Sequence, residues 1–404
     1  MRVKLAIATL FCWALGASGY AKEPLGLTLG PGGTVLKDGK AYRGVGLNYY
    51  NCFNRTLHNN ADTSYEAGFR VLAEYHIPFV RFSATGFWPK EMKLYQENRK
   101  AYFRLMDGVV RAAEKNGIGL IPSLFWFNAT IPDLVGEPVD QWGNTNSKTI
   151  AFMRQYTHEV VSRYLNSPAI WAWEMGNEYN CDADPTDYML KHHLSHNRPP
   201  VSPANGTPAV RTSRDFSSTS DLVVAFREFA QTVRRDDPYR LIESGADFPK
   251  PSAWHFYKEH NSTKDNPEQF QTMLGLSAPD SVNMIDVHCY NDTPSKPNAK
   301  DNWKRLDDAV IAARNIGKPL FVGEFQFPSE YDPDSPQAHK ALEDFLARLN
   351  RLHVPLAAVW VFDLPNQDDH NAKNPRNINA TNRRAWELPL LREHNKKLAG
   401  NSNP

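Results

Sequence analysis

The sequence predicts an α/β protein whose architecture is a (β/α)₈ barrel. Eight short runs rich in apolar, β-branched and aromatic residues alternate with segments of helical spacing. Strands that alternate with helices pair in parallel, and eight such units in roughly 350 residues suit a closed barrel. An open doubly wound sheet is the alternative. Its first strand usually leads into a glycine-rich phosphate loop, and Gly44-Val-Gly46-Leu-Asn-Tyr does not match that loop.

The first element is a secretory signal peptide at residues 1–21. Arg2 and Lys4 precede an apolar run that ends in small residues, and the run is too short for a stable membrane anchor. Phe11 precedes Cys12, which argues against a lipid anchor. We therefore expect residues 22–404 to form one exported catalytic domain. This domain is expected to be soluble, secreted or periplasmic, monomeric and without a membrane anchor.

The barrel elements follow in order. Asp38-Gly39 predicts a β-hairpin that covers the bottom of the barrel. The eight expected strands cover residues 42–50, 77–87, 117–127, 170–178, 240–247, 284–291, 318–327 and 355–364. Helical spacing of apolar residues predicts helices at residues 65–76, 99–116, 148–165, 221–235, 303–316, 337–353 and 384–399. The long segments 128–147, 180–220 and 248–283 are expected to be loops on the C-terminal face, where barrel enzymes carry their active sites.

The composition excludes several classes of protein. A formal net charge of +1 gives no electrostatic case for binding nucleic acid or a membrane surface. Cys52, Cys181 and Cys289 are an odd number in the mature chain, so they form no disulfide scaffold, although one bridge such as Cys52–Cys181 stays open. We expect no cofactor and no metal.

Polar and aromatic side chains stand at the ends of the expected strands. Glu178 follows Asn177 at the end of the fourth strand, and Glu324 ends the seventh. The other strand-end residues are Arg81, His288, Tyr290 and Trp360. Cleavage of a sugar acetal needs two carboxyl groups that face each other across one bond. One such glutamate is commonly a solvated loop residue, but two of them with these neighbours predict a catalytic pair.

Other carboxylates are separated from this pair by position. Glu174 lies four residues before Glu178, or about 13 Å deeper along a strand at 3.3 Å per residue. A carboxylate inside the barrel must be paired or neutral, so Glu174 is expected to be structural, with an arginine as its partner. Glu243 also lies within its strand, so it is expected to be structural for the same reason. Asp363 and Asp369 are interpreted either as contacts to sugar hydroxyls or as solvated loop charges.

With these residues the chain resembles glycoside hydrolase family 5 and its clan of (β/α)₈ retaining glycosidases, which includes cellulases and β-mannanases. The motifs that carry the resemblance are Gly176-Asn177-Glu178, His288-Cys-Tyr290, Gly323-Glu324 and Trp360. The resemblance implies that Glu178 is the acid/base and Glu324 the nucleophile. It also implies that Asn177 binds the sugar 2-hydroxyl and that Tyr290 and Arg81 support the nucleophile. Hydrogen bonds from these two residues are expected to hold the pKa of Glu324 low.

The third strand departs from the family pattern. Family 5 cellulases commonly carry a histidine there, whereas this chain reads Leu124-Phe-Trp126-Phe-Asn128. Trp126 and Asn128 are therefore candidates to line the sugar subsite, with core packing as the alternative for Trp126. This departure weakens an assignment to plain cellulase activity.

The resulting functional hypothesis is a secreted retaining β-glycosidase that acts on a β-linked oligo- or polysaccharide of the β-mannan or β-glucan type. Action inside the chain is favoured. The alternatives are an inactive carbohydrate-binding barrel and an exo-acting glycosidase or transglycosylase. A metal-dependent barrel hydrolase would carry a His-x-His pair where this chain reads Asn48-Tyr49-Tyr50. His192, His193 and His196 are interpreted as residues of a solvated polar loop.

Overall fold

The computed structural model describes residues 24–186, 199–291, 302–328, 330–368 and 376–400. The expected signal peptide, the three loop histidines and Asp369 lie outside these described residues. Within the described ranges, no helix is both long enough and apolar enough to cross a membrane.

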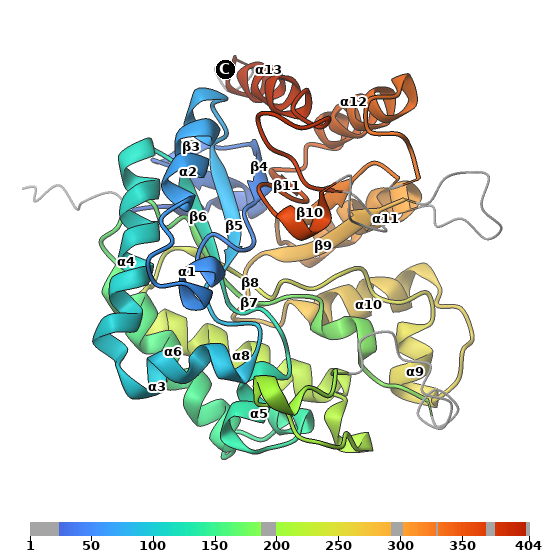
Figure 1. Cartoon of the computed structure of the whole chain (residues 1–404). Coiled ribbons are helices and arrows are strands. Elements are labelled where there is room, and N and C mark those ends of the chain that lie inside the picture. Colours follow the sequence, from blue (N-terminus) through green and yellow to red (C-terminus); the bar gives the residue numbers. More distant parts are fainter. Residues whose placement is uncertain (1–23, 187–198, 292–301, 329, 369–375, 401–404) are drawn as a thin grey trace, which may run out of the picture.

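Eight parallel strands form the centre of the molecule, and helices surround them (Figure 1). In sheet order the strands are β8 (Leu241–Glu243), β7 (Ala172–Gly176), β6 (Gly119–Phe125), β5 (Phe79–Ser83), β4 (Gly44–Asn48), β11 (Leu356–Val359), β10 (Leu320–Gln326) and β9 (Ile285–Tyr290). The backbone N–H groups of Asn283 and Met284 both lie 3.1 Å from the Ile242 carbonyl oxygen, which draws the outer strands β8 and β9 together. The predicted (β/α)₈ barrel is confirmed in this nearly closed form.

The helices that follow the strands agree closely with the sequence pattern. They are α2 (Tyr65–Glu74), α4 (Arg99–Asn116), α6 (Lys148–Tyr164), α8 (Thr219–Asp236), α11 (Asn302–Ile316), α12 (Pro336–Arg351) and α13 (Glu387–Gly400). Local signals fix their ends. The Asn98 side chain accepts the Ala101 N–H at 3.0 Å and begins α4, and Gly117 ends it with a φ of 66°.

The expected long loops are partly helical, so that part of the prediction is wrong. Segment 128–147 contains α5 (Thr130–Val135), and segment 248–283 contains α9 (Ala253–Glu259) and α10 (Pro267–Ser277). Asn266 and Gln269 form a capping box that begins α10. Two further short helices, α1 (Asn54–His58) and α3 (Lys93–Glu97), also lie outside the predicted segments.

An antiparallel sheet covers the bottom of the barrel, as predicted. It consists of β1 (Leu27–Leu29), β2 (Val35–Lys37) and β3 (Lys40–Ala41). Asp38 and Gly39 form the turn with φ values of 51° and 72°, the left-handed pair that a type I′ hairpin requires. Leu27 and Val35 pack with apolar residues from the bottom of the barrel, including Trp171.

The barrel interior changes character along its axis. Apolar side chains fill the lower layer, whereas Arg81, Glu174, Glu243 and Asp286 lie above it with no exposed surface. A second, larger apolar core fills the space between the strands and the outer helices. This arrangement leaves a polar centre that opens at the C-terminal ends of the strands.

Candidate active site

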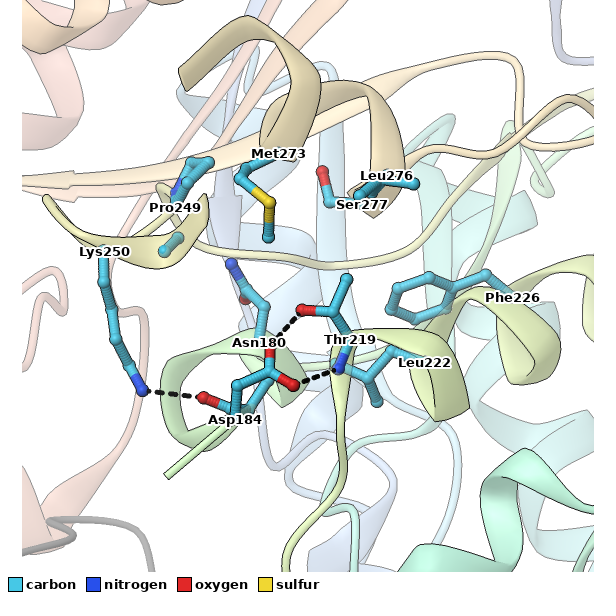
Figure 2. Close-up of a pocket in the computed structure, with 12 residues that line it drawn as sticks. Asn180, Asp184, Thr219, Leu222, Phe226, Pro249, Lys250, Met273, Leu276 and Ser277 are labelled. Atoms are coloured by element: carbon cyan, nitrogen blue, oxygen red, sulfur yellow. Dashed lines mark hydrogen bonds between the residues drawn. The ribbon is translucent and has the colours of Figure 1, made fainter. Parts of the chain in front are cut away.

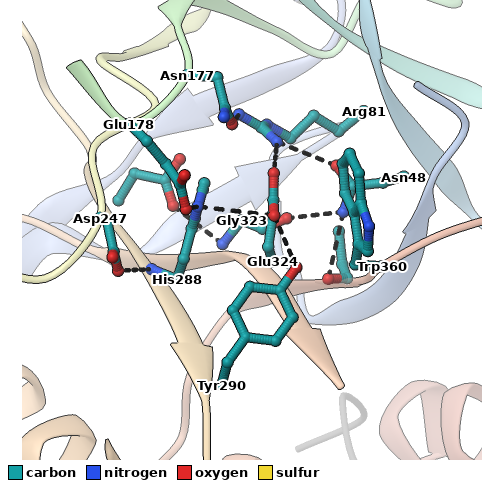
Figure 3. A network of polar contacts seen from close by, with 12 residues as sticks. Asn48, Arg81, Asn177, Glu178, Asp247, His288, Tyr290, Gly323, Glu324 and Trp360 are labelled. Carbon is teal, nitrogen blue, oxygen red and sulfur yellow. Dashed lines mark hydrogen bonds and ion pairs between the residues drawn. The ribbon is translucent and has the colours of Figure 1, made fainter. Parts of the chain in front are cut away.

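The fold brings the two predicted glutamates together. Glu324 lies on β10, and Glu178 lies two residues beyond the end of β7. His288 of β9 stands between them, with Nδ1 2.8 Å from Glu178 Oε1 and 3.8 Å from Glu324 Oε2 (Figure 3). Two strand ends that are far apart in sequence therefore present carboxyl groups on either side of one imidazole nitrogen.

The two carboxyl groups have different surroundings. The Glu178 side chain is 31% exposed, whereas that of Glu324 is 6% exposed. Glu178 adopts a left-handed backbone conformation with a φ of 55°, and its N–H donates to the Gly245 carbonyl at 2.7 Å. Glu178 can therefore exchange protons with water or a departing group, and Glu324 is enclosed by protein.

Arg81 of β5 links Glu324 to the barrel interior. Its five N–H donors bind Glu324 Oε1 at 2.8 Å, both oxygens of Glu174 at 2.5 and 2.9 Å, Asn48 Oδ1 at 3.1 Å and Asn177 Oδ1 at 2.7 Å. The predicted arginine partner of Glu174 is confirmed as Arg81. The guanidinium therefore fixes the nucleophile candidate and the predicted sugar-binding asparagine at once.

The peptide group of Gly323 is held from both sides. Its N–H donates to Asp286 Oδ1 at 2.9 Å, and its carbonyl accepts from Asn48 Nδ2 at 2.9 Å. A Cβ on this glycine would lie 2.6 Å from the Asp286 carboxylate, so no larger residue fits without a shift. The pairing register of β10 also changes between Val322 and Glu324. These contacts set the direction in which Glu324 leaves the strand.

Tyr290 of β9 supports Glu324 as predicted. Its hydroxyl donates to Glu324 Oε2 at 2.7 Å. Burial raises the pKa of Tyr290 well above its usual value, so the hydroxyl keeps the proton that it donates. The guanidinium of Arg376 lies 4.6 Å from the centre of the Tyr290 ring and restrains it from the other face.

The expectation of a low pKa for Glu324 is wrong for this arrangement. Burial raises the pKa of Glu324, and the neighbouring charge of Glu178 adds to the increase. The charge of Arg81 and the hydrogen bond from Tyr290 act in the opposite direction without reversing it. The sequence identified the groups that lower this pKa but gave no measure of how deeply the carboxyl group is buried.

Burial lowers the pKa of His288, with the charge of Glu324 acting in the opposite direction. The imidazole is therefore neutral at neutral pH. A neutral ring that contacts Glu178 through Nδ1 can share a proton with it without adding a positive charge to the site.

Aromatic side chains form one wall of the site. The Trp126 ring is tilted by 31° to the Trp360 ring at 6.0 Å between centres and meets Tyr50 edge-on at 4.8 Å. The Arg81 guanidinium lies 4.4 Å from the centre of the Trp126 ring. The Trp360 indole N–H donates to Gln367 Oε1 at 2.9 Å. Trp126 is 6% exposed, so it is largely a packing residue beneath this wall, whereas Trp360 is partly exposed.

Two residues predicted as possible sugar contacts have hydrogen-bond partners within the protein. The Asn128 backbone carbonyl accepts the Trp142 indole N–H at 2.7 Å, and among the described residues its side-chain Oδ1 is buried without a hydrogen-bond partner. Asp363 accepts the Tyr49 hydroxyl at 2.9 Å and pairs with Arg55 at 2.9 Å. Asp363 therefore stabilises the loop after β11.

Three polar residues of the site were not identified from the sequence. Asn48 and Asp286 hold the Gly323 peptide, as described above. Asp247 follows β8, and one of its carboxylate oxygens lies within 4.8 Å of a carboxylate oxygen of Glu178 and of a ring nitrogen of His288. Asp247 ends the fifth expected strand, so the strand-end rule that selected Glu178 could have found it.

Two groups of side chains in the described residues approach closely enough to hold a cation. The first is Glu178, Asp247 and His288, and the second is Glu174, Glu243 and Asp286 in the interior. In the first group, His288 Nδ1 is already hydrogen-bonded to Glu178. In the second, Arg81 meets Glu174, and burial raises the pKa of Glu243 and of Asp286. A hydrogen bond and an ion pair therefore already engage His288 in the first group and Glu174 in the second.

A pocket lies behind the site, between α8, α9, α10 and the segment after β7 (Figure 2). Asn180 lines it and also joins it to the site, because its side chain accepts the Asp247 N–H at 3.0 Å and donates to the Asp247 carbonyl at 2.7 Å. Asp184 is held at its edge by Thr219. Cys52, Cys181 and Cys289 are all free thiols, so the bridge between Cys52 and Cys181 is not formed.

Relatives of known activity cover parts of the chain. It is 42% identical over 179 residues to mannan endo-1,4-β-mannosidase F of Aspergillus fumigatus, and 29% identical over 177 residues to mannan endo-1,4-β-mannosidase A of Hypocrea jecorina. These matches cover 40% and 38% of this chain and 37% and 38% of those proteins. The chain thus matches less than two-fifths of the length of each relative.

Solved structures match the fold over most of the chain. The endo-1,4-β-mannanase of Rhizomucor miehei superposes with a TM-score of 0.64 at 16% identity, over 92% of this chain and 99% of that one. An exo-β-1,4-mannosidase of Opitutaceae bacterium strain TAV5 gives a TM-score of 0.59 at 13% identity, over 92% and 63%. The model of the cellulase family, glycosyl hydrolase family 5, matches residues 38–360. Since this match includes both glutamates and nearly the whole barrel, the chain belongs to glycosyl hydrolase family 5.

Proposed function

We propose that this chain is an exported, retaining, endo-acting β-glycoside hydrolase that cleaves β-1,4-linked mannan. The observation that carries the proposal is the position of His288 Nδ1, 2.8 Å from Glu178 and 3.8 Å from Glu324. Two carboxyl groups that both lie near one nitrogen atom are close together. Retaining enzymes have their carboxyl groups about 5–5.5 Å apart, whereas inverting enzymes keep them about 6.5–9.5 Å apart to admit a water molecule.

In the first step, Glu324 attacks the anomeric carbon while Glu178 gives its proton to the departing glycosidic oxygen. The exposure of each group suits its role. Glu324 is enclosed and receives two fixed hydrogen bonds, from Arg81 and Tyr290, which orient one lone pair toward the sugar. Glu178 is partly exposed, so the leaving portion of the polysaccharide can reach its proton.

In the second step, a water molecule cleaves the ester between Glu324 and the sugar, and Glu178 removes a proton from that water. Formation of the ester removes the charge of Glu324. Because that charge raises the proton affinity of a nearby carboxyl group, its loss allows Glu178 to act as a base. One residue therefore serves as acid and then as base.

The remaining groups bind the sugar. Asn177 Oδ1 accepts from Arg81, so Asn177 Nδ2 is the donor that would meet the 2-hydroxyl. Trp360 offers a partly exposed ring beside Tyr50, and such a ring can stack on a pyranose. The names of the relatives favour mannan over glucan, and the departure at Trp126 from the cellulase pattern agrees with that preference.

The test is release of reducing sugar and the size of the products on β-mannan, glucomannan, β-1,4-glucan, β-1,3-glucan and xylan, with Glu178→Gln as the control. We expect internal cleavage of β-mannan that the control lacks, with the β-anomer as the first product in proton NMR. An α-anomer would exclude retention. Release of single sugars would show that the enzyme cleaves at chain ends rather than inside the chain. Binding without cleavage across the panel would favour an inactive carbohydrate-binding barrel.

A further inference from the structure

Asp247 is rigidly placed beside the acid/base. The Asn180 side chain binds both the N–H and the carbonyl of its backbone, at 3.0 and 2.7 Å. Asp247 Oδ1 accepts the backbone N–H groups of Phe248 at 2.6 Å and His288 at 3.3 Å, and Asp247 Oδ2 accepts from the Cys181 thiol at 3.6 Å. These contacts fix the carboxylate on the side of the site that carries Glu178 (Figure 3).

The Asp247 carboxylate receives no hydrogen bond from Arg81, the guanidinium that binds Glu324. All five N–H donors of Arg81 are taken by Glu174, Glu324, Asn48 and Asn177. One carboxylate oxygen each of Asp247 and Glu178 and one ring nitrogen of His288 nevertheless lie within 4.8 Å of one another. Two carboxyl groups at this distance raise each other's proton affinity.

Other titratable or charged groups face this pair from four elements. They are His288 and Tyr290 on β9, Glu324 on β10, Cys181 on η4 (Tyr179–Asp182) and Arg305 on α11. Arg305 stacks 4.6 Å from the Phe248 ring and donates to Asn302 Oδ1 at 3.0 Å, and its charge favours the ionised form of Asp247. Burial and the charge of Glu178 raise the pKa of Asp247 to about 6, which leaves it ionised above that pH.

We propose that Asp247 is a positioning residue that keeps Glu178 protonated in the unliganded enzyme and makes it a stronger base once the sugar ester has formed. This inference rests on the proposed function and concerns the same site. The charge of Glu324 disappears in the ester, but the charge of Asp247 stays. Asp247 therefore prevents the proton affinity of Glu178 from falling too far in the second step. It also anchors the backbone of His288, the partner of Glu178.

The test compares Asp247→Asn with the wild type in the dependence of kcat/KM on pH. Asparagine keeps an oxygen acceptor for the Phe248 and His288 N–H groups but removes the charge. We expect the basic limb of the profile to move to lower pH by on the order of one unit. Asp237→Asn is the matched control. Asp237 is buried before the start of β8, where it binds Trp173 and Arg240, so this change should lower stability and leave the limb in place.

Leaving-group dependence separates a change of proton affinity from a general defect. Aryl β-mannosides with very acidic phenols need no proton from Glu178, so Asp247→Asn should retain most of its glycosylation rate on them and lose more on poor leaving groups. Equal losses on all leaving groups, or a profile that superposes on that of the wild type, would overturn the proposal.

A reciprocal measurement does not depend on how well Asp247→Asn folds. Because the coupling of two sites is mutual, Glu178→Gln should lower the titration midpoint of Asp247, observed by carbon NMR of labelled aspartate carboxyl groups. An unchanged midpoint would contradict the coupling. If the wild type hydrolyses no glycoside, the proposed function fails, and this NMR experiment still decides whether Asp247 and Glu178 are coupled.

Discussion

The barrel contains two layers of carboxyl groups whose chemistry differs, although strands β7 to β10 and the residues just after them supply both layers. The rim layer comprises Glu178, Asp247 and Glu324, and the interior layer comprises Glu174, Glu243 and Asp286. Glu178 follows the interior residue Glu174 by four positions, and Asp247 follows Glu243 by four. All three interior groups have no exposed surface, whereas Glu178 is 31% exposed.

The two layers balance their charge in different ways. In the interior, Arg81 binds both oxygens of Glu174, while burial raises the pKa of Glu243 and of Asp286. At the rim, His288, Tyr290 and Arg81 offer hydrogen bonds to ionised or proton-sharing carboxyl groups. Depth along a strand therefore decides whether a carboxyl group is structural or able to exchange a proton, and Arg81 is the residue that joins the two layers.

The sharpest way to break this comparison is Glu324→Ala. We expect hydrolysis of mannan to fall by at least on the order of 10⁴-fold, as for the loss of a covalent nucleophile in other hydrolases. The fold should survive, because the change removes only one of the partners of Arg81. Activity assays together with thermal unfolding by circular dichroism check both expectations.

Sodium azide identifies the role of each glutamate in the same system. With Glu324→Ala and an activated aryl β-mannoside, azide should occupy the position of the lost carboxylate and give the α-mannosyl azide. With Glu178→Ala, azide should instead attack the intermediate and give the β-mannosyl azide. If Glu324→Ala gave the β-mannosyl azide and Glu178→Ala the α-mannosyl azide, Glu178 would be the nucleophile and Glu324 the acid/base.

A smaller effect is expected from Tyr290→Phe, which removes the hydroxyl that binds Glu324 at 2.7 Å and leaves the ring beneath Arg376. Loss of one donor in a transition state costs on the order of 10²-fold or more in rate. The loss should appear in kcat and kcat/KM for glycosylation, measured in single-turnover experiments. Kinetics close to those of the wild type would show that Tyr290 only packs against Arg376.

The sequence predicted the barrel because strand and helix periods alternate along the chain, and the structure agrees at all eight strands. It also predicted that Glu178 and Glu324 would meet, since the ends of parallel strands share one rim. Asp247 obeys the same rule but lies four residues beyond β8, which spans only Leu241–Glu243, so its motif was weak. Helix α10 was also missed, although its capping box was readable from Asn266 and Gln269.

Other features could not be read from single positions. The raised pKa of Glu324 depends on burial by several strands together, and the roles of Asn48 and Asp286 depend on the Gly323 peptide that they share. Trp126 illustrates the same limit, because a tryptophan at a strand end can face a cleft or pack beneath it. These properties arise from contacts between distant segments rather than from spacing along the chain.

The smallest expected effect tests the interior layer through Glu243→Gln. Burial raises the pKa of Glu243 well above its usual value in the folded protein. The stability that its proton supports is complete below the pKa of the unfolded chain and declines as the pH rises toward the folded value. Glutamine has no proton to lose, so urea unfolding should show the variant gaining stability relative to the wild type as the pH is raised from 4 to 8.

Glu174→Gln gives the contrast within the same layer. It removes the charge that pairs with Arg81 at 2.5 Å, and breaking a buried pair costs about 3–5 kcal/mol. The variant should therefore be less stable than the wild type in the same urea unfolding experiments. If Glu243→Gln also lost stability as the pH rose, Glu243 would be an ionised partner of Arg81. The interior layer would then resemble the rim, with its charge met by a cation rather than by a proton.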